Sequence, residues 1–138
     1  MAAERALLDT GTLVAFLHRD DAAHVAVAAA LREYRGVLLT TEAVLTESVY
    51  LLGRVRGGAE ACLEFFVRGA AVLVPSSRSS LARGKALMRT YADLPADFAD
   101  ATLVALAEEM GTFIIYTLDR RGFSTYRGEG GERFEVRP

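Results

Sequence analysis

The stretch that decides the fold runs from Arg5 to Leu17 and reads Arg5-Ala6-Leu7-Leu8-Asp9-Thr10-Gly11-Thr12-Leu13-Val14-Ala15-Phe16-Leu17. A short apolar run ends abruptly at Asp9, a turn signal follows, and apolar residues then recur at helical spacing. This order predicts a buried strand, a tight corner at Asp9 and a helix. Ligands of open α/β sheets bind just beyond the carboxyl ends of the strands, which is where Asp9 would lie.

The bulk composition is typical of a globular domain. The chain has 138 residues, of which 51% are hydrophobic and 25% charged, so we expect residues 1–138 to form one domain with one core. Charges interrupt every long apolar stretch, and the amino terminus lacks the apolar core of a signal peptide. We therefore expect a cytoplasmic protein that does not associate with membranes. Cys62 is the only cysteine, which excludes a disulfide framework and favours a core position.

The net charge of -2 does not by itself indicate a nucleic-acid-binding protein, because such proteins are usually basic. Lys85 is the only lysine, so almost all of the positive charge is carried by arginine. Arginine suits bidentate contacts with phosphate groups, but a high genomic G+C content also favours it.

Strand patterns alternate with helix patterns along the chain. Predicted strands cover 6–8, 36–40, 70–74 and 113–116, with a possible edge strand at 133–136. The first predicted helix begins at Leu13. Further helices are predicted over 22–34, 41–56, 59–68, 79–91 and 97–110. The tail after Asp119 is polar and rich in glycine, and no helix is predicted there. This alternation predicts an α/β fold with a parallel sheet flanked by helices and right-handed crossovers.

Five acidic residues lie at positions that the surrounding apolar pattern predicts to be at least partly buried. Asp9 and Asp119 each follow an apolar strand. Glu47 borders the apolar stripe of its helix, since Val44 precedes it by three residues and Leu51 follows it by four. Asp100 lies on the core-facing stripe of its helix, and Asp97 lies one turn earlier.

Each carboxylate taken alone has a structural explanation. Asp97 is a natural helix cap, Asp9 could cap the helix that follows it, and Asp119 could be a turn residue. Asp100 could be favoured by the helix dipole, and Glu47 could be half exposed. Taken together, several partly buried carboxylates at one edge of a sheet repel one another and lose hydration. A hard divalent cation such as Mg²⁺ or Mn²⁺ offsets both effects.

In their order and spacing, four segments resemble PIN-domain ribonucleases, and most closely the VapC-type toxins of toxin–antitoxin pairs. The segments are Leu7 to Thr10, Thr40 to Glu47, Asp100 to Ala107, and Thr117 to Phe123. Each motif is weak alone, and the four together cover nearly the whole chain. The resemblance implies a three-layer α/β/α fold with a central, mostly parallel sheet of four to five strands.

The resemblance also implies roles for individual residues. Asp9, Asp100 and Asp119 match the family's metal-binding aspartates, and Glu47 matches its helix glutamate, so these four are the predicted catalytic acids. Thr10 and Thr117 match hydroxyls that line the same pocket. Asp97 is an extra acid, which leaves the choice between Asp97 and Asp100 open. Glu42 matches the glutamate less well.

The function implied by the resemblance is that of a Mg²⁺-dependent endoribonuclease, with Mn²⁺ as an alternative ion. Its substrate would be RNA, often structured RNA such as tRNA. A small antitoxin protein and a homodimer are the implied partners. As contacts for the RNA backbone we consider a set of arginines near strand ends and helix termini: Arg54, Arg56, Arg120 and Arg121.

Other function classes remain to be weighed. A catalytically inactive PIN-like module that binds RNA or protein is the main alternative. The stretch around Asp9 also resembles the active-site turn of a dimeric aspartic protease, but the helical periodicity after Leu13 disfavours that all-β fold. A haloacid-type phosphatase would carry a second aspartate at position 11, where Gly11 stands. Activity on DNA or flaps would call for extra loops that this chain is too short to carry.

Overall fold

The central element is a parallel sheet in the order β3-β2-β1-β4-β5. The computed structural model describes residues 3–94 and 96–138. The strands are β1 (Arg5–Leu8), β2 (Val37–Thr40), β3 (Val72–Leu73), β4 (Ile114–Tyr116) and β5 (Glu135–Arg137). All four strand pairings are parallel. This confirms the predicted α/β class and its mostly parallel sheet of four to five strands.

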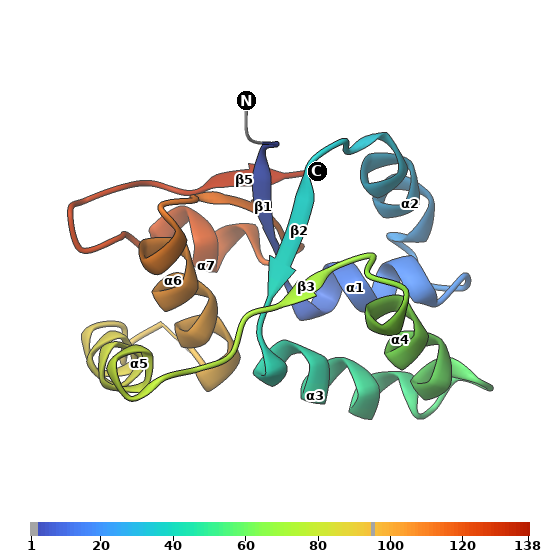
Figure 1. The fold of residues 1–138 in the computed structure, drawn as a ribbon, viewed down its shortest axis with the longest axis horizontal. Coiled ribbons are helices and arrows are strands. Elements are labelled where there is room, and N and C mark those ends of the chain that lie inside the picture. The colour runs from blue at the N-terminus through green and yellow to red at the C-terminus, as the bar shows by residue number, and fades with distance from the viewer. Residues whose placement is uncertain (1–2, 95) are drawn as a thin grey trace.

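Helices cover both faces of the sheet and make the fold a three-layer α/β/α sandwich. In Figure 1, α1 to α4 lie on one side of the sheet and α5 to α7 on the other. The helices are α1 (Thr10–Leu17), α2 (His24–Glu33), α3 (Glu42–Leu52), α4 (Gly58–Val67), α5 (Arg78–Thr90), α6 (Phe98–Met110) and α7 (Arg120–Thr125).

Each layer of helices packs on its own apolar cluster. Leu7 and Ile115 face the cluster that α5, α6 and α7 cover, which includes Leu103 and Phe123. Ala6, Leu8 and Tyr116 face the opposite cluster, under the helices from α1 to α4. Successive residues of a strand point to opposite faces of the sheet, so β1 contributes to both clusters. Cys62 is fully buried in the second cluster, which confirms its predicted core position.

The central strand β1 brings distant parts of the chain together. Leu7 is in register with Leu39 of β2 on one side and with Ile115 of β4 on the other. Because the strands are parallel, their carboxyl ends lie at the same edge of the sheet. Three helices begin just beyond that edge, and Asp9, Thr41 and Asp119 are the N-caps of α1, α3 and α7.

The element prediction was wrong at several boundaries. The polar tail contains α7, a helix of six residues whose Gly122 and Phe123 are buried. The predicted helix over 41–56 ends at Leu52, where Gly53 is the C-cap and its N–H donates to the Tyr50 carbonyl, and Gly57, with a φ of 71°, is the N-cap of α4. The first helix begins at Thr10 and leaves no separate corner after Asp9.

Polar contacts occur at the start of α2 and on α5. The N-cap of α2 is Ala23, without a side-chain hydrogen bond, and the Asp21 side chain accepts from the Ala23 N–H at 2.9 Å. On α5, Arg83 pairs with Glu108 of α6 at 2.7 Å. Among residues 3–94 and 96–138, no helix is both long enough and apolar enough to cross a bilayer.

Candidate functional site

Asp9 lies at the centre of the candidate site, directly after the central strand β1. Its side chain is 7% exposed. Oδ1 accepts a hydrogen bond from the Thr10 N–H at 2.7 Å, and Oδ2 accepts one from the Thr117 hydroxyl at 2.7 Å. The first bond belongs to the cap of α1, and the second ties β1 to the chain that follows β4. Asp9 is therefore held from two sides by groups that position its carboxylate.

A continuous chain of hydrogen bonds extends from Asp9 to two more predicted acids. The Thr10 hydroxyl donates to Glu47 Oε1 at 2.7 Å, which links α1 to the middle of α3. On the other side, the Thr117 hydroxyl accepts from the Asp119 N–H at 3.0 Å. Thr10 and Thr117 are both buried. The structure thus connects Glu47, Asp9 and Asp119 through these two hydroxyls, with Asp119 joined by its backbone N–H, while its carboxylate accepts from the Gly122 N–H at 3.0 Å.

The remaining two acids stand at the start of α6. Asp97 is the N-cap of this helix, and its Oδ1 accepts from the Asp100 N–H at 2.8 Å. Asp100 lies in the first turn and is half-buried. Its Oδ2 accepts a hydrogen bond from the Tyr126 hydroxyl at 3.0 Å. Asp97 is exposed and serves the helix end, whereas Asp100 points into the molecule, so the geometry favours Asp100 as the functional acid.

The pKa values of Asp9 and Asp100 are raised by burial and by the charges of neighbouring acids. Burial raises the pKa of Asp9 to about 6, against hydrogen bonds from Thr117 and Thr10 that lower it, and the charges of Asp119 and Asp97 raise it further. Burial also raises the pKa of Asp100 to about 7, and the charges of Asp97 and Asp9 add to this effect. Both carboxylates are therefore destabilised in their charged form by the surroundings that the fold gives them.

No cationic side chain relieves this repulsion in the part of the chain that the structure describes. The ion pairs there join Arg83 to Glu108 and Arg137 to Glu4 and Glu135, and none involves a site acid. A divalent cation would supply the missing positive charge, and the donor set consists of the oxygen ligands that Mg²⁺ and Mn²⁺ prefer. Asp9, Asp100 and Asp119 therefore fit such an ion.

The acids are spaced too widely to enclose an ion by themselves. Within residues 3–94 and 96–138, no three His, Cys, Asp or Glu side chains form a ready-made metal-binding group. Mg²⁺ typically binds one or two carboxylates and retains several water molecules, so this spacing is compatible with the ion.

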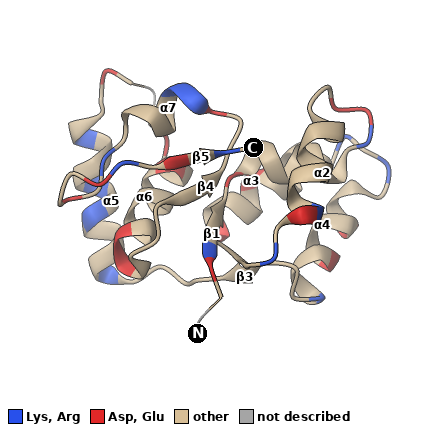
Figure 2. Ribbon diagram, turned by 90° about the horizontal axis from the view of Figure 1, so that it is seen from above, with Lys and Arg blue, Asp and Glu red and all other residues tan. Residues whose placement is uncertain are grey.

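Of the four arginines considered as RNA contacts, two lie far from the strand ends and two lie next to Asp119. Arg54 and Arg56 are exposed in the turn after α3, at the end of that helix that points away from the strand ends. Arg120 and Arg121 open α7, next to Asp119, and this basic segment is visible in Figure 2. Arg120 donates to the Pro138 carbonyl, whereas Arg121 lines a small cavity of about 70 Å³ with Asp119 and Tyr126. Of these four arginines, Arg121 is the one that shares a cavity with a predicted site acid.

Sequence reasoning missed two residues of this region. Tyr126 lies beyond all four motifs, and only the fold of α7 reveals its contact with Asp100. Phe98 stands between Asp97 and Asp100 and is 46% exposed. It lines an open cavity of about 390 Å³ together with Glu47 and neighbouring residues of α3 and α6. Phe98 precedes the segment from Asp100 to Ala107, so no sequence motif marks it. Glu42 is exposed at the first position of α3 and has no place in the network.

Comparison with known proteins agrees with this geometry. The model of the PIN domain family matches residues 6–129. The chain is 34% identical to "Ribonuclease VapC26" of Mycobacterium tuberculosis over 134 residues, which are 96% of this chain and 99% of that protein.

Solved structures share the fold. Mycobacterium tuberculosis VapC20, described as a Sarcin-Ricin loop cleaving toxin, superposes with a TM-score of 0.82 at 21% identity, over 96% of this chain and 99% of that one. A toxin–antitoxin complex from Klebsiella pneumoniae matches with a TM-score of 0.69 at 18% identity, over 96% of both chains. VapBC2 from Rickettsia felis, bound to a promoter DNA fragment, matches with a TM-score of 0.69 at 13% identity, over 97% of this chain and 99% of that one.

At such low identity the structural matches speak for the fold alone. The family rests on the matching domain model and on the relative at 34% identity. On these grounds the chain belongs to the PIN-domain family and is a relative of the VapC ribonucleases.

Proposed function

We propose that this protein is a metal-dependent endoribonuclease that cleaves phosphodiester bonds of RNA. The observation that carries the proposal is the network of Glu47, Asp9 and Asp119, joined by Thr10 and Thr117 and faced by Asp100, without a cation to balance it. Asp9, Asp100 and Asp119 would hold Mg²⁺ or Mn²⁺. Such an ion supplies a Lewis acid that lowers the pKa of water and stabilises negative charge on a leaving oxygen.

The chain's own residues prepare the site for this chemistry. The Thr117 hydroxyl and the Thr10 N–H fix both oxygens of Asp9, and the Thr10 hydroxyl holds Glu47 beside it. Tyr126 orients Asp100. Glu47, which is not one of the three acids proposed to hold the ion, would accept a proton from the attacking water. The oxygen of that water would bond to phosphorus in line as the bond from phosphorus to the 3′-oxygen breaks. The 3′-oxygen would take up a proton from water, so that the products carry a 5′-phosphate and a 3′-hydroxyl.

The test is cleavage of end-labelled structured RNA, such as a pool of tRNA, by purified protein. Asp9→Asn and Asp100→Asn each lower the rate in Mg²⁺ at least about 100-fold, because a ligand charge is lost at a site that needs it. Glu60→Gln on α4 is the matched control, since it removes an exposed carboxylate far from the network and leaves the rate unchanged. Cleavage by both aspartate variants at the wild-type rate contradicts the assignment.

We also propose that the protein is the toxin of a toxin–antitoxin pair, is inhibited by a small antitoxin and forms a homodimer. Support comes from the VapC relative and from the toxin–antitoxin complexes that share the fold. Expression of the chain alone arrests bacterial growth, and Asp9→Asn removes the arrest. Growth that is unaffected by the active chain, with active protein present in the cells, contradicts the toxin role. Light scattering on the purified protein tests the dimer.

A further inference from the structure

Phe98 is an exposed aromatic side chain at the rim of the acid network. It is the first residue of α6, it stands between the cap Asp97 and the site acid Asp100, and it is 46% exposed. The next residue, Ala99, is buried, and the bond from the Asp100 N–H to Asp97 fixes the first turn. The ring is therefore carried by a fixed helix end and not by a loop, which suits a side chain that positions a ligand.

The ring lines a cavity that shares Glu47 with the site. The cavity, of about 390 Å³, opens between α3 and α6 and is lined by Ala43, Thr46, Glu47, Asp97, Phe98 and Ala99. Glu47 is a member of both the cavity and the hydrogen-bonded chain that leads to Asp9. A group bound against Phe98 is thus next to the acids and not on a separate face of the molecule.

The chemistry of this cavity selects its occupant. A phosphate would be repelled by Glu47 and Asp97. A nucleobase is neutral and planar, so it can stack on the ring, and its N–H groups can donate to the two carboxylates. Stacking of a base on an aromatic side chain is available only where the base is unpaired.

We propose that Phe98 stacks on an unpaired base of the RNA beside the scissile phosphate and so helps to select unpaired nucleotides. This inference rests on the proposed nuclease function. Phe98 acts here as a positioning residue, because it holds the substrate and does not take part in the bond-breaking step. The cavity that Phe98 lines with Glu47 is distinct from the one that Arg121 lines with Asp119.

The first experiment separates binding from chemistry. Phe98→Ala raises KM for a hairpin RNA cut in its loop by about 10- to 100-fold, which is the usual range for the loss of one base stack, and changes kcat little. Phe98→Tyr restores KM because it keeps the ring. Val67→Ala, a truncation of an exposed apolar residue on α4, leaves both constants unchanged. Thermal unfolding confirms that each variant is folded.

The substrate supplies a matching control. An abasic site is placed in turn at each nucleotide next to the cleavage position. When the abasic site replaces the base that stacks on Phe98, the KM of the wild type rises. It then equals the KM of Phe98→Ala for intact RNA. Phe98→Ala itself no longer responds to that abasic site, because the contact is already lost.

A second readout does not depend on cleavage. The sequence contains no tryptophan, so Phe98→Trp introduces a unique fluorophore. Addition of short single-stranded RNA, in EDTA or in Ca²⁺, quenches its emission through stacking, and a blunt duplex of the same sequence does not. Val67→Trp serves as the control and responds to neither RNA.

The outcomes distinguish this inference from the function on which it rests. A wild-type KM for Phe98→Ala together with an unquenched Phe98→Trp overturns the stacking role while nuclease activity stands. Loss of self-association in Phe98→Ala with unchanged KM also overturns it, because the ring is then covered by a second copy of the chain. Quenching of Phe98→Trp by single-stranded RNA, together with a wild type that cleaves no RNA in Mg²⁺ or Mn²⁺, refutes the nuclease proposal. The placement of the stacked base beside a scissile phosphate is then overturned, and Phe98 is a base-binding residue of a catalytically inactive module.

Discussion

At the scale of single residues, Thr117 shows how the fold supports its acids. It is 1% exposed, donates to Asp9 Oδ2 and accepts from the Asp119 N–H. The Thr117 hydroxyl therefore contacts two of the predicted acids. Asp9 lies 108 residues before Thr117 in the sequence, and Asp119 lies 2 residues after it. Its hydrogen bond is also the largest influence that lowers the pKa of Asp9 against the effect of burial.

Thr117→Val tests this role with almost no change in volume. Without the donor, the pKa of Asp9 rises above its present value of about 6, so the carboxylate is protonated over a wider range of pH. We expect the cleavage rate to fall about 10-fold at pH 7 and further at pH 6, and the acidic limb of the rate profile to move to higher pH. Single-turnover rates between pH 5 and 9 measure this.

The control for this variant is Thr112→Val, which alters another buried threonine at the amino end of β4. Its hydroxyl makes only a long contact of 3.5 Å to the Met110 carbonyl. The rate profile of Thr112→Val stays at its wild-type position. A Thr117→Val profile that coincides with the wild type would show that the hydrogen bond has no influence on the ionisation of Asp9.

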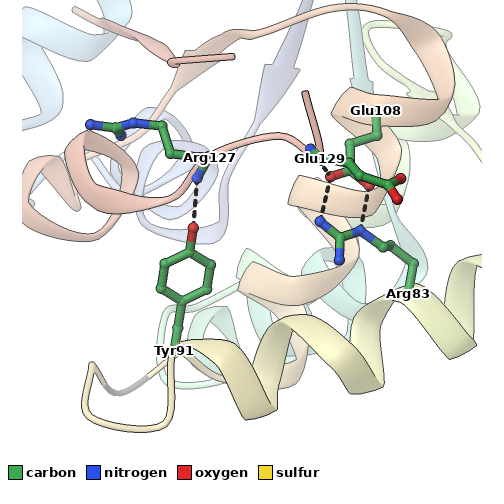
Figure 3. A network of polar contacts seen from close by, with 5 residues as sticks. All are labelled: Arg83, Tyr91, Glu108, Arg127 and Glu129. Carbon is green, nitrogen blue, oxygen red and sulfur yellow. Dashed lines mark hydrogen bonds and ion pairs between the residues drawn. The ribbon is translucent and has the colours of Figure 1, made fainter. Parts of the chain in front are cut away.

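At the scale of elements, α5 depends on polar contacts as well as on apolar burial. Only Gly84 and Leu87 of this helix are buried. Arg83 makes two hydrogen bonds to Glu108 of α6, at 2.7 and 2.8 Å, and Glu108 also accepts from the Glu129 N–H (Figure 3). Glu108 thus joins α5, α6 and the segment after α7.

Glu108→Gln removes the charge at the centre of this junction. The Arg83 guanidinium then loses a charge-assisted partner in a half-buried position, and we expect unfolding to become easier by about 1–2 kcal/mol. This lowers Tm by roughly 3–8 °C for a domain of this size. Glu135→Gln is the control, because its pair with Arg137 is more exposed and contributes little. Equal Tm values for the two variants would contradict the junction's structural role.

The same scale shows what the sequence can predict about the elements. The order of strands and long helices follows from hydrophobic patterning, and the predicted strands over 6–8, 36–40, 70–74 and 113–116 and the helix over 97–110 were found on this basis. The short helix α7 escaped, because six residues with a central Gly122 carry no periodicity. What stabilises it is tertiary: Asp119 caps it, and Phe123 packs in the core.

At the scale of the whole molecule, the site lowers the stability of the metal-free fold. The pKa values of Asp9 and Asp100 are raised from 3.8 to about 6 and about 7, so the folded state binds more protons than the unfolded state between about pH 4 and pH 7. Stability from these groups is fully present below pH 4 and is lost as the pH rises through 6 and 7. A bound divalent cation reverses this loss.

Thermal unfolding in EDTA measures the effect. Asp100→Asn raises Tm relative to the wild type at pH 8, by an amount that corresponds to about 1–2 kcal/mol, and the difference disappears at pH 4. Mg²⁺ or Mn²⁺ raises the Tm of the wild type at pH 8 by mass action and has a much smaller effect on Asp9→Asn. A wild-type Tm in EDTA that is as high at pH 8 as at pH 4, with no response to either ion, would contradict this account.

The site as a whole was partly readable from the sequence. Asp9, Glu47, Asp100 and Asp119 were singled out by position, and the fold joins three of them through Thr10 and Thr117 and sets Asp100 within reach of their charges. Their catalytic roles stay predictions. Tyr126 and Phe98 were not found, because nothing local marks them. Their positions depend on how α7 and the start of α6 meet the strand ends.

The placement of β1 between β2 and β4 has a consequence for synthesis of the protein. Asp9 is synthesised long before Thr117 and Asp119, which follow β4. A chain that is released early has no strand on one side of β1 and only part of the acid set. The nuclease activity proposed above therefore requires synthesis to pass β4 and reach Asp119, so shorter products would lack it.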